Sequence, residues 1–86
     1  MNIRSIFLIL KNKILNLLFR FLQNKSTVVI NLFYKKKKIF GKIIGFDEFM
    51  NLVIDDGYEV LENLDKIKIG RLLIRGDSIM MIHEKL

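Results

Sequence analysis

The stretch IIGFDEFMNLVIDD, residues 43–56, decides the fold. Two apolar, β-branched segments flank a polar break that begins at Asp47-Glu48, and such segments favour β-strands joined by a turn. The first segment belongs to a longer apolar run over residues 39–46 that contains Gly41 and Gly45, and glycine within a strand indicates a bend or a close backbone approach. The stretch therefore predicts two strands joined by a short connection, the first of them bent.

The same pattern continues on both sides of this stretch. β-Branched and aromatic residues predict five strands, over residues 27–34, 39–46, 50–55 with a continuation over 58–61, 67–74 and 79–83. The four connections are short, so consecutive strands are expected to pair antiparallel. The expected fold class is mainly β: an N-terminal α-helix followed by a strongly bent five-stranded antiparallel barrel, with the helix over one open end.

The helix is predicted from an amphipathic pattern near the N-terminus. Polar residues recur every three or four positions between residues 13 and 24, and apolar residues fill the remaining face. Asn12 is a candidate cap for the start, and Asn24-Lys25-Ser26 is expected to form the exit. The chain is thus divided into an N-terminal extension over residues 1–12 and one domain over residues 13–86.

Composition limits how this domain is stabilised. The chain has 86 residues, 51% of them hydrophobic and 28% charged, which is far from a disordered composition. With no Cys and one His (His83), neither a disulfide nor a zinc site is expected, and no cofactor is predicted. Chains this short seldom gain enough stability from one core. Association with other subunits is therefore the expected support.

Charge is distributed unevenly along the chain. Residues 1–46 carry ten basic side chains and no acidic one, whereas residues 47–86 carry five basic and nine acidic side chains. Such asymmetry suggests a polyanionic partner or a charge-matched neighbour. The abundance of lysine itself has a second explanation, because Ile, Lys and Asn together number 32, as expected from AT-biased coding DNA.

Several classes of protein are not supported. The few Ser and Thr residues lack a nearby base in a recognisable pattern, so no enzyme is expected. No apolar run approaches the roughly 20 residues that span a bilayer, and the one after Arg4 ends at Lys11 without a cleavage site for a signal peptide. The absence of Cys fits the cytosol or the nucleus. One alternative of another class stays open: the basic amphipathic N-terminal half could bind an anionic membrane surface.

A second stretch, GRLLIRGDSI at residues 70–79, completes a pattern with the first. Together the two resemble the two halves of the Sm motif, and the likeness to the Sm and Sm-like protein family covers roughly residues 13–83. Within that family the amino-acid sequence of residues 43–56 is most similar to that of the E-type subunits. Ser78 departs from the pattern, because the family usually has Asn after Gly-Asp.

This resemblance implies a ring of seven different subunits, in which the fourth strand of one subunit pairs with the fifth strand of the next. An E-type subunit is expected between the Sm F and Sm G subunits. Such rings bind the uridine-rich Sm site of spliceosomal small nuclear RNAs, in particles that splice pre-mRNA. The implied location is the nucleus, with a cytoplasmic assembly stage, or a nucleus-like compartment of a reduced genome. A Sm-like ring acting in RNA decay or on oligouridine tails is the alternative.

The resemblance also assigns roles to residues of the two motifs. In the family pattern Phe49 stacks on one face of a base, Asn51 contacts its edge and Arg75 covers the other face. These groups suit single-stranded RNA, which is bound by stacking on aromatic or guanidinium planes and by hydrogen bonds to base edges. Gly76 is expected to permit the tight turn that presents Arg75. Supporting roles fall to three further residues: Asp47, Met50 and Asp77.

Other interpretations of these and neighbouring residues remain. Phe49 could be an ordinary core residue, and Asn51 and Asp77 could be simple turn residues. Asp55-Asp56 is expected to form solvated turn groups or to face a basic neighbour rather than bind a metal. The run Lys35 to Lys38 could contact RNA or a partner, or only be solvated. His83 is expected at a surface or an interface.

Overall fold

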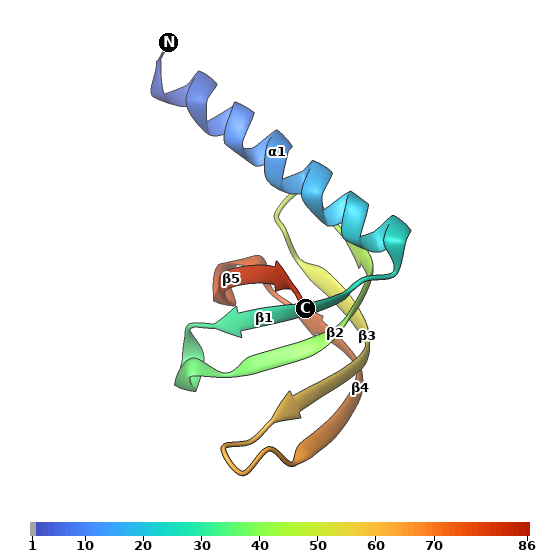
Figure 1. The fold of residues 1–86 in the computed structure, drawn as a ribbon. Coiled ribbons are helices and arrows are strands. Elements are labelled where there is room, and N and C mark those ends of the chain that lie inside the picture. Colours follow the sequence, from blue (N-terminus) through green and yellow to red (C-terminus); the bar gives the residue numbers. More distant parts are fainter. Residues whose placement is uncertain (1) are drawn as a thin grey trace.

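The computed structural model describes residues 2–86, and they form one helix followed by five strands (Figure 1). The elements are α1 (Ile3–Asn24), β1 (Thr27–Leu32), β2 (Lys38–Phe46), β3 (Leu52–Val60), β4 (Lys66–Ile74) and β5 (Ile79–Glu84). Single 3-10 turns occupy Tyr34–Lys36 and Gly76–Ser78. Each predicted strand is present, and the predicted fold class, a helix followed by a bent five-stranded antiparallel sheet, is confirmed.

The strand order is β4-β3-β2-β1-β5, with every neighbouring pair antiparallel. The expectation that all consecutive strands pair is wrong for β4 and β5, because β5 pairs with β1, as Ile82 does with Ile30. The sheet curls strongly enough to bring the chain leaving β4 round to the other side of β1 (Figure 1). Within residues 2–86, the outer edges of β4 and β5 therefore have no strand partner.

The pairing of β2 with β3 is irregular, and irregular pairing bends a sheet. The register of this pair shifts between Phe40 and Lys42 and again between Ile43 and Gly45. A Cβ atom at Gly41 would collide with Cγ2 of Ile54 and would lie 3.2 Å from Cα of Gly57. Only glycine allows the two backbones to approach this closely, as the sequence pattern indicated for this strand.

The core lies between the concave side of the sheet and the second half of α1. Leu18, with 1% of its surface exposed, and Phe21 are the buried residues of the helix. They pack in one cluster with side chains from the strands: Val28, Ile30, Ile39, Ile43, Leu52, Ile54 and Ile74. Only one end of the helix is therefore held by the sheet.

The helix begins much earlier than residue 13. Asn2 caps it, with its side-chain oxygen accepting a hydrogen bond from the backbone N–H of Ser5 at 2.8 Å. Asn12 lies inside the helix, so its prediction as the cap is wrong. The exit at Lys25 is confirmed, and that residue adopts a left-handed conformation with φ of 52°. The division into an extension over 1–12 and a domain over 13–86 stays a prediction, although α1 runs through the boundary without a break.

The first half of α1 extends past the sheet into open space (Figure 1). Five apolar side chains of this half are exposed, among them Ile3, with 83% of its surface accessible, and Leu10, with 54%. No helix of residues 2–86 is long and apolar enough to cross a membrane.

Candidate functional site

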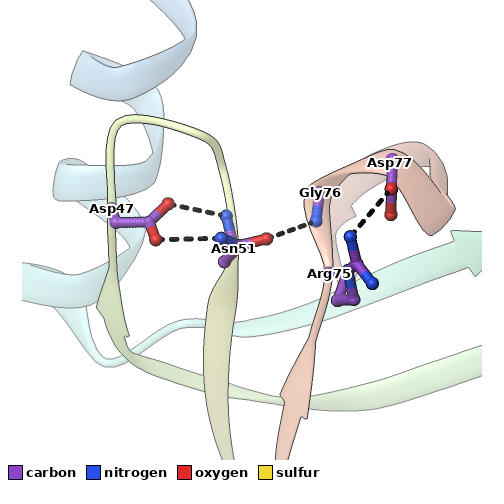
Figure 2. Close-up of polar contacts among 5 residues, drawn as sticks. All are labelled: Asp47, Asn51, Arg75, Gly76 and Asp77. Atoms are coloured by element: carbon purple, nitrogen blue, oxygen red, sulfur yellow. Dashed lines mark hydrogen bonds and ion pairs between the residues drawn. The ribbon is translucent and has the colours of Figure 1, made fainter.

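Two loops that are distant in sequence meet at one end of the sheet. The first connects β2 to β3 and contains Asp47 and Asn51; the second follows β4 and contains Arg75, Gly76 and Asp77 (Figure 2). Strands β3 and β4 are neighbours, with Leu52 opposite Ile74, so the residue before β3 and the residues after β4 come together. The antiparallel register thus joins the two sequence motifs into one site.

One carboxylate organises the first loop. Oδ1 of Asp47 accepts hydrogen bonds from the backbone N–H groups of Phe49, at 2.9 Å, and Asn51, at 3.0 Å. Oδ2 of Asp47 accepts a third, from the side-chain amide of Asn51 at 2.9 Å. The hydrogen bonds that Asp47 accepts from Asn51, first from its side chain and then from its backbone N–H, hold the pKa of Asp47 below its ordinary value. Asp47 is therefore ionised near neutral pH and fixes the orientation of Asn51.

Asn51 then connects the two loops. Its side-chain oxygen accepts a hydrogen bond from the backbone N–H of Gly76 at 2.9 Å, across 25 positions of sequence (Figure 2). At Gly76 a Cβ atom would collide with the carbonyl oxygen of Phe49 and lie 2.9 Å from that of Met50. The position therefore requires glycine because of the close approach of the first loop. Met50 in turn has a φ of 62°, which turns the chain back toward β3.

The side chains that face outward surround a hollow of about 430 Å³. It is lined by Phe49, Asn51, Leu73, Arg75 and Asp77. Phe49 is 71% exposed, so the interpretation of Phe49 as a core residue is wrong. Arg75 is also exposed, and its Nη2 lies 3.4 Å from Oδ2 of Asp77. An aromatic ring and a guanidinium thus border the same hollow, with an oriented amide beside them.

The amide of Asn51 keeps some hydrogen-bonding capacity. A primary amide has two N–H donors and an oxygen with two lone pairs. One donor is used by Asp47 and one lone pair by Gly76. The side chain can therefore still donate one hydrogen bond and accept one, which suits a planar partner with a donor next to an acceptor.

The predicted site residues are thus gathered in one place, although their roles toward RNA stay predictions. Phe49, Asn51 and Arg75 line the hollow, and Gly76 and Asp47 hold its two loops together. Asp77, for which a supporting role was predicted, contacts the guanidinium of Arg75 through its side chain.

Sequence reasoning missed Leu73, which lines the hollow and is largely exposed. The signal was present in the alternation of β4. Ile74 is buried in the core, so its neighbour must face the opposite side of the sheet.

The remaining candidate residues lie away from this hollow. Oδ2 of Asp55 on β3 lies 3.4 Å from Nη2 of Arg71 on β4. The hydrogen bond from Arg71 is the main cause that lowers the pKa of Asp55. In the lysine run, Lys37 lies 3.7 Å from Glu59. His83 is exposed on β5, the outermost strand.

Comparisons with known proteins point to one family. Residues 20–84 match the LSM domain family. The probable small nuclear ribonucleoprotein E of Caenorhabditis elegans is 49% identical over 70 residues, which cover 79% of this chain and 78% of that protein. A heptameric archaeal Sm protein superposes with a TM-score of 0.73 at 22% identity, covering 83% of this chain and 98% of that one, and this likeness shows the fold. The Sm protein of Pyrococcus abyssi in complex with a uridine heptamer superposes with a TM-score of 0.69 at 28% identity, covering 83% and 96%.

Proposed function

The chain belongs to the LSM domain family, and from this premise we propose that it is the E-type subunit of a seven-membered Sm ring that binds uridine-rich RNA. The observation that carries the proposal is the fixed amide of Asn51 in the same hollow as the exposed side chains of Phe49 and Arg75. Two solved relatives fit it: one is a heptamer and the other is bound to a uridine heptamer. We also propose a role in pre-mRNA splicing and a nuclear location, which the name of the small nuclear ribonucleoprotein E relatives supports.

The hollow suits uracil more than the other pyrimidine. On its pairing edge uracil presents an N–H donor between two carbonyl acceptors, so it offers a donor next to an acceptor in either order. Cytosine presents an amino donor next to an unprotonated ring nitrogen and offers such a pair in one order only, which a fixed amide can discriminate against. Asn51 retains one donor and one acceptor for that edge, while Phe49 and Arg75 supply two surfaces for stacking. Each stacked base contributes about 1–3 kcal/mol. Seven such sites in one ring bind one RNA with a high effective local concentration.

The sheet has the two open edges that ring formation needs. β4 and β5 are its outermost strands, and a strand from another subunit can extend the sheet at either edge. We propose that the neighbours are the Sm F and Sm G subunits of the same organism. Exposed apolar side chains on both outer strands, such as Ile67 and Met80, support contacts of this kind.

The proposal is tested by isolating the assembled complex through a tag on this chain. We expect the co-purifying proteins to be six other Sm-family subunits, and the complex to retain a uridine-rich RNA. Replacing uridine by cytidine in the RNA should weaken binding, and the double variant Phe49→Ala with Asn51→Ala should weaken binding to the uridine form. Comparing an internal uridine tract with a 3′ oligouridine tail separates a Sm ring from a Sm-like ring. A tagged chain that recovers liposomes but no ring and no RNA would overturn the proposal in favour of membrane-surface binding.

A further inference from the structure

The first half of α1 leaves an apolar face uncovered. Leu18 and Phe21, on the second half, are buried against the sheet, whereas Ile3 and Leu10 on the first half, and Ile14 at the start of the second, are exposed. The helix is nevertheless regular from Ile3 onward and is capped at Asn2. Figure 1 shows this half projecting beyond the sheet on the side where β5 lies, far from β4.

Beneath this overhang the surface is hollowed and apolar. A hollow of about 270 Å³ lies between α1 and β5, with Ile14 and Leu17 on the helix side and Met80 and Met81 on the strand side. A second hollow, of about 410 Å³, continues along α1 past Leu10 to the β2–β3 loop. The two hollows adjoin, because Ile14 and Met50 line both, and together they are here named the α1–β5 groove.

The α1–β5 groove opens onto an unpaired strand edge. β5 pairs with β1 on one side, where Ile82 faces Ile30, and has no strand on its other side within residues 2–86. A strand added to that free edge would continue the sheet beneath the first half of α1. Because side chains alternate between the two faces of a strand, half of the added side chains would point toward the groove.

We propose that the α1–β5 groove receives apolar side chains of the Sm-family subunit whose strand pairs with β5, so that the overhang of α1 covers this neighbour. The inference rests on the proposed function, because it needs a ring neighbour at β5. Two observations support the proposal: the groove lies next to the open edge of β5, and the first half of α1 projects on that side of the sheet (Figure 1). The hollow between α1 and β5 favours a protein over RNA, because it is lined by apolar side chains and one glycine, whereas RNA needs cations and stacking planes. Of the two hollows, Lys11, Glu48 and Phe49 line only the second, at the β2–β3 loop.

A first experiment compares two double variants in the co-purified ring. Leu10→Lys with Ile14→Lys places charge in the groove, and Leu8→Lys with Ile9→Lys makes the same change at exposed helix positions that line neither hollow. Mass photometry gives the concentration at which each ring dissociates. We expect the groove variant to raise that concentration about tenfold or more, since two apolar contacts are lost, with little change for the control. Equal values for the two variants would overturn the inference.

A second experiment identifies what lies under the overhang. The chain has no Cys, so Leu10→Cys, Met81→Cys and Lys68→Cys can each carry one benzophenone crosslinker, on α1, β5 and β4 respectively. We expect the α1 and β5 positions to capture the same subunit and the β4 position to capture a different one. Capture of RNA, of the β4-side subunit or of nothing from the α1 position in an intact ring would overturn the inference and leave the proposed function standing. If the unchanged chain formed no ring, both would fall together.

Discussion

Substitution of Gly76 by alanine tests the contact that joins the two loops. A methyl group at this position would meet the carbonyl oxygens of Phe49 and Met50, the second at 2.9 Å. Both are backbone atoms of a loop tied by Asp47, so they cannot move aside as a flexible side chain would. Gly76 is not among the residues with positive φ, so the expected effect is steric rather than conformational.

The cost follows from the contacts that the methyl group disrupts. Separating the loops breaks the hydrogen bond from the N–H of Gly76 to Asn51, which contributes about 1 kcal/mol. Overpacking at a fixed contact adds about 1–3 kcal/mol. The sum is about 2–4 kcal/mol, and the same displacement moves Arg75 away from Phe49 and so widens the hollow.

Gly45→Ala is the matched control, because a Cβ atom there would have Val53 Cβ as its nearest neighbour, at 4.0 Å. We expect Gly76→Ala to lower the melting temperature of the purified complex by at least about 5 °C and to weaken binding of uridine-rich RNA about tenfold. Gly45→Ala should leave RNA binding unchanged and stabilise the strand by up to about 1 kcal/mol. Identical melting temperatures and RNA affinities for the two variants would refute the steric argument.

Other predictions concern the carboxylate, the stacking groups, the helix and the open edges. The pKa of Asp47 lies below its ordinary value of 3.8, so its stabilisation of the loop is fully present above pH 3.8 and is lost as the pH falls through the lowered pKa. RNA affinity, measured by fluorescence anisotropy, should therefore be constant between about pH 5 and 8, where this carboxylate stays ionised; a loss within that range would contradict the assignment. Arg75→Ala with Asn51→Ala should weaken RNA retention by the ring without unfolding the subunit, as checked by gel shift and circular dichroism, and unchanged retention would place the RNA site elsewhere. Leu18→Ala should cost about 2–5 kcal/mol of the free energy of unfolding, whereas Leu8→Ala, at an exposed position, should cost less than about 0.5 kcal/mol; equal losses in thermal denaturation would show that the helix is not held where we describe. Expressed alone, the chain should aggregate or form homomeric rings, and a well-behaved monomer in light scattering would contradict that.

Much of the fold could be predicted because its signals are local. Each strand has its own run of β-branched residues, and each connection has its own polar or glycine-containing break. The candidate site residues came from the resemblance to the Sm motif, whose two halves are each local: Asp47, Phe49 and Asn51 occupy one loop, and Arg75 and Gly76 lie in another short turn. The hydrogen bond from Gly76 to Asn51 could not be predicted in this way, because it depends on the β3–β4 register, which places Leu52 opposite Ile74.

The start of α1 could not be predicted from amphipathicity. A polar and an apolar face become distinct only where a helix packs on one side, and that packing begins near Leu15. Residues 3–12 are apolar on several sides of the helix, so their sequence shows no amphipathic pattern. Their helical propensity alone did not mark the start of the helix. The pairing of β5 with β1 is nonlocal as well, since it depends on how far the sheet curls at Gly41.

Many exposed apolar side chains lie on the two outer strands and on the free half of the helix, and they account for part of the apolar composition. Central positions such as Ile54 and Ile30 are buried, whereas Ile67 on β4, Met80 on β5 and Ile6 on α1 are exposed. Apolar side chains next to unpaired strand edges favour uncontrolled association unless other subunits cover them.

The charges lead to a complementary conclusion. Phe49, Asn51 and Arg75 all lie in the acidic half of the chain. We therefore expect recognition at the proposed RNA site to depend on stacking and edge contacts, with the lysines of the first half adding general attraction to a polyanion.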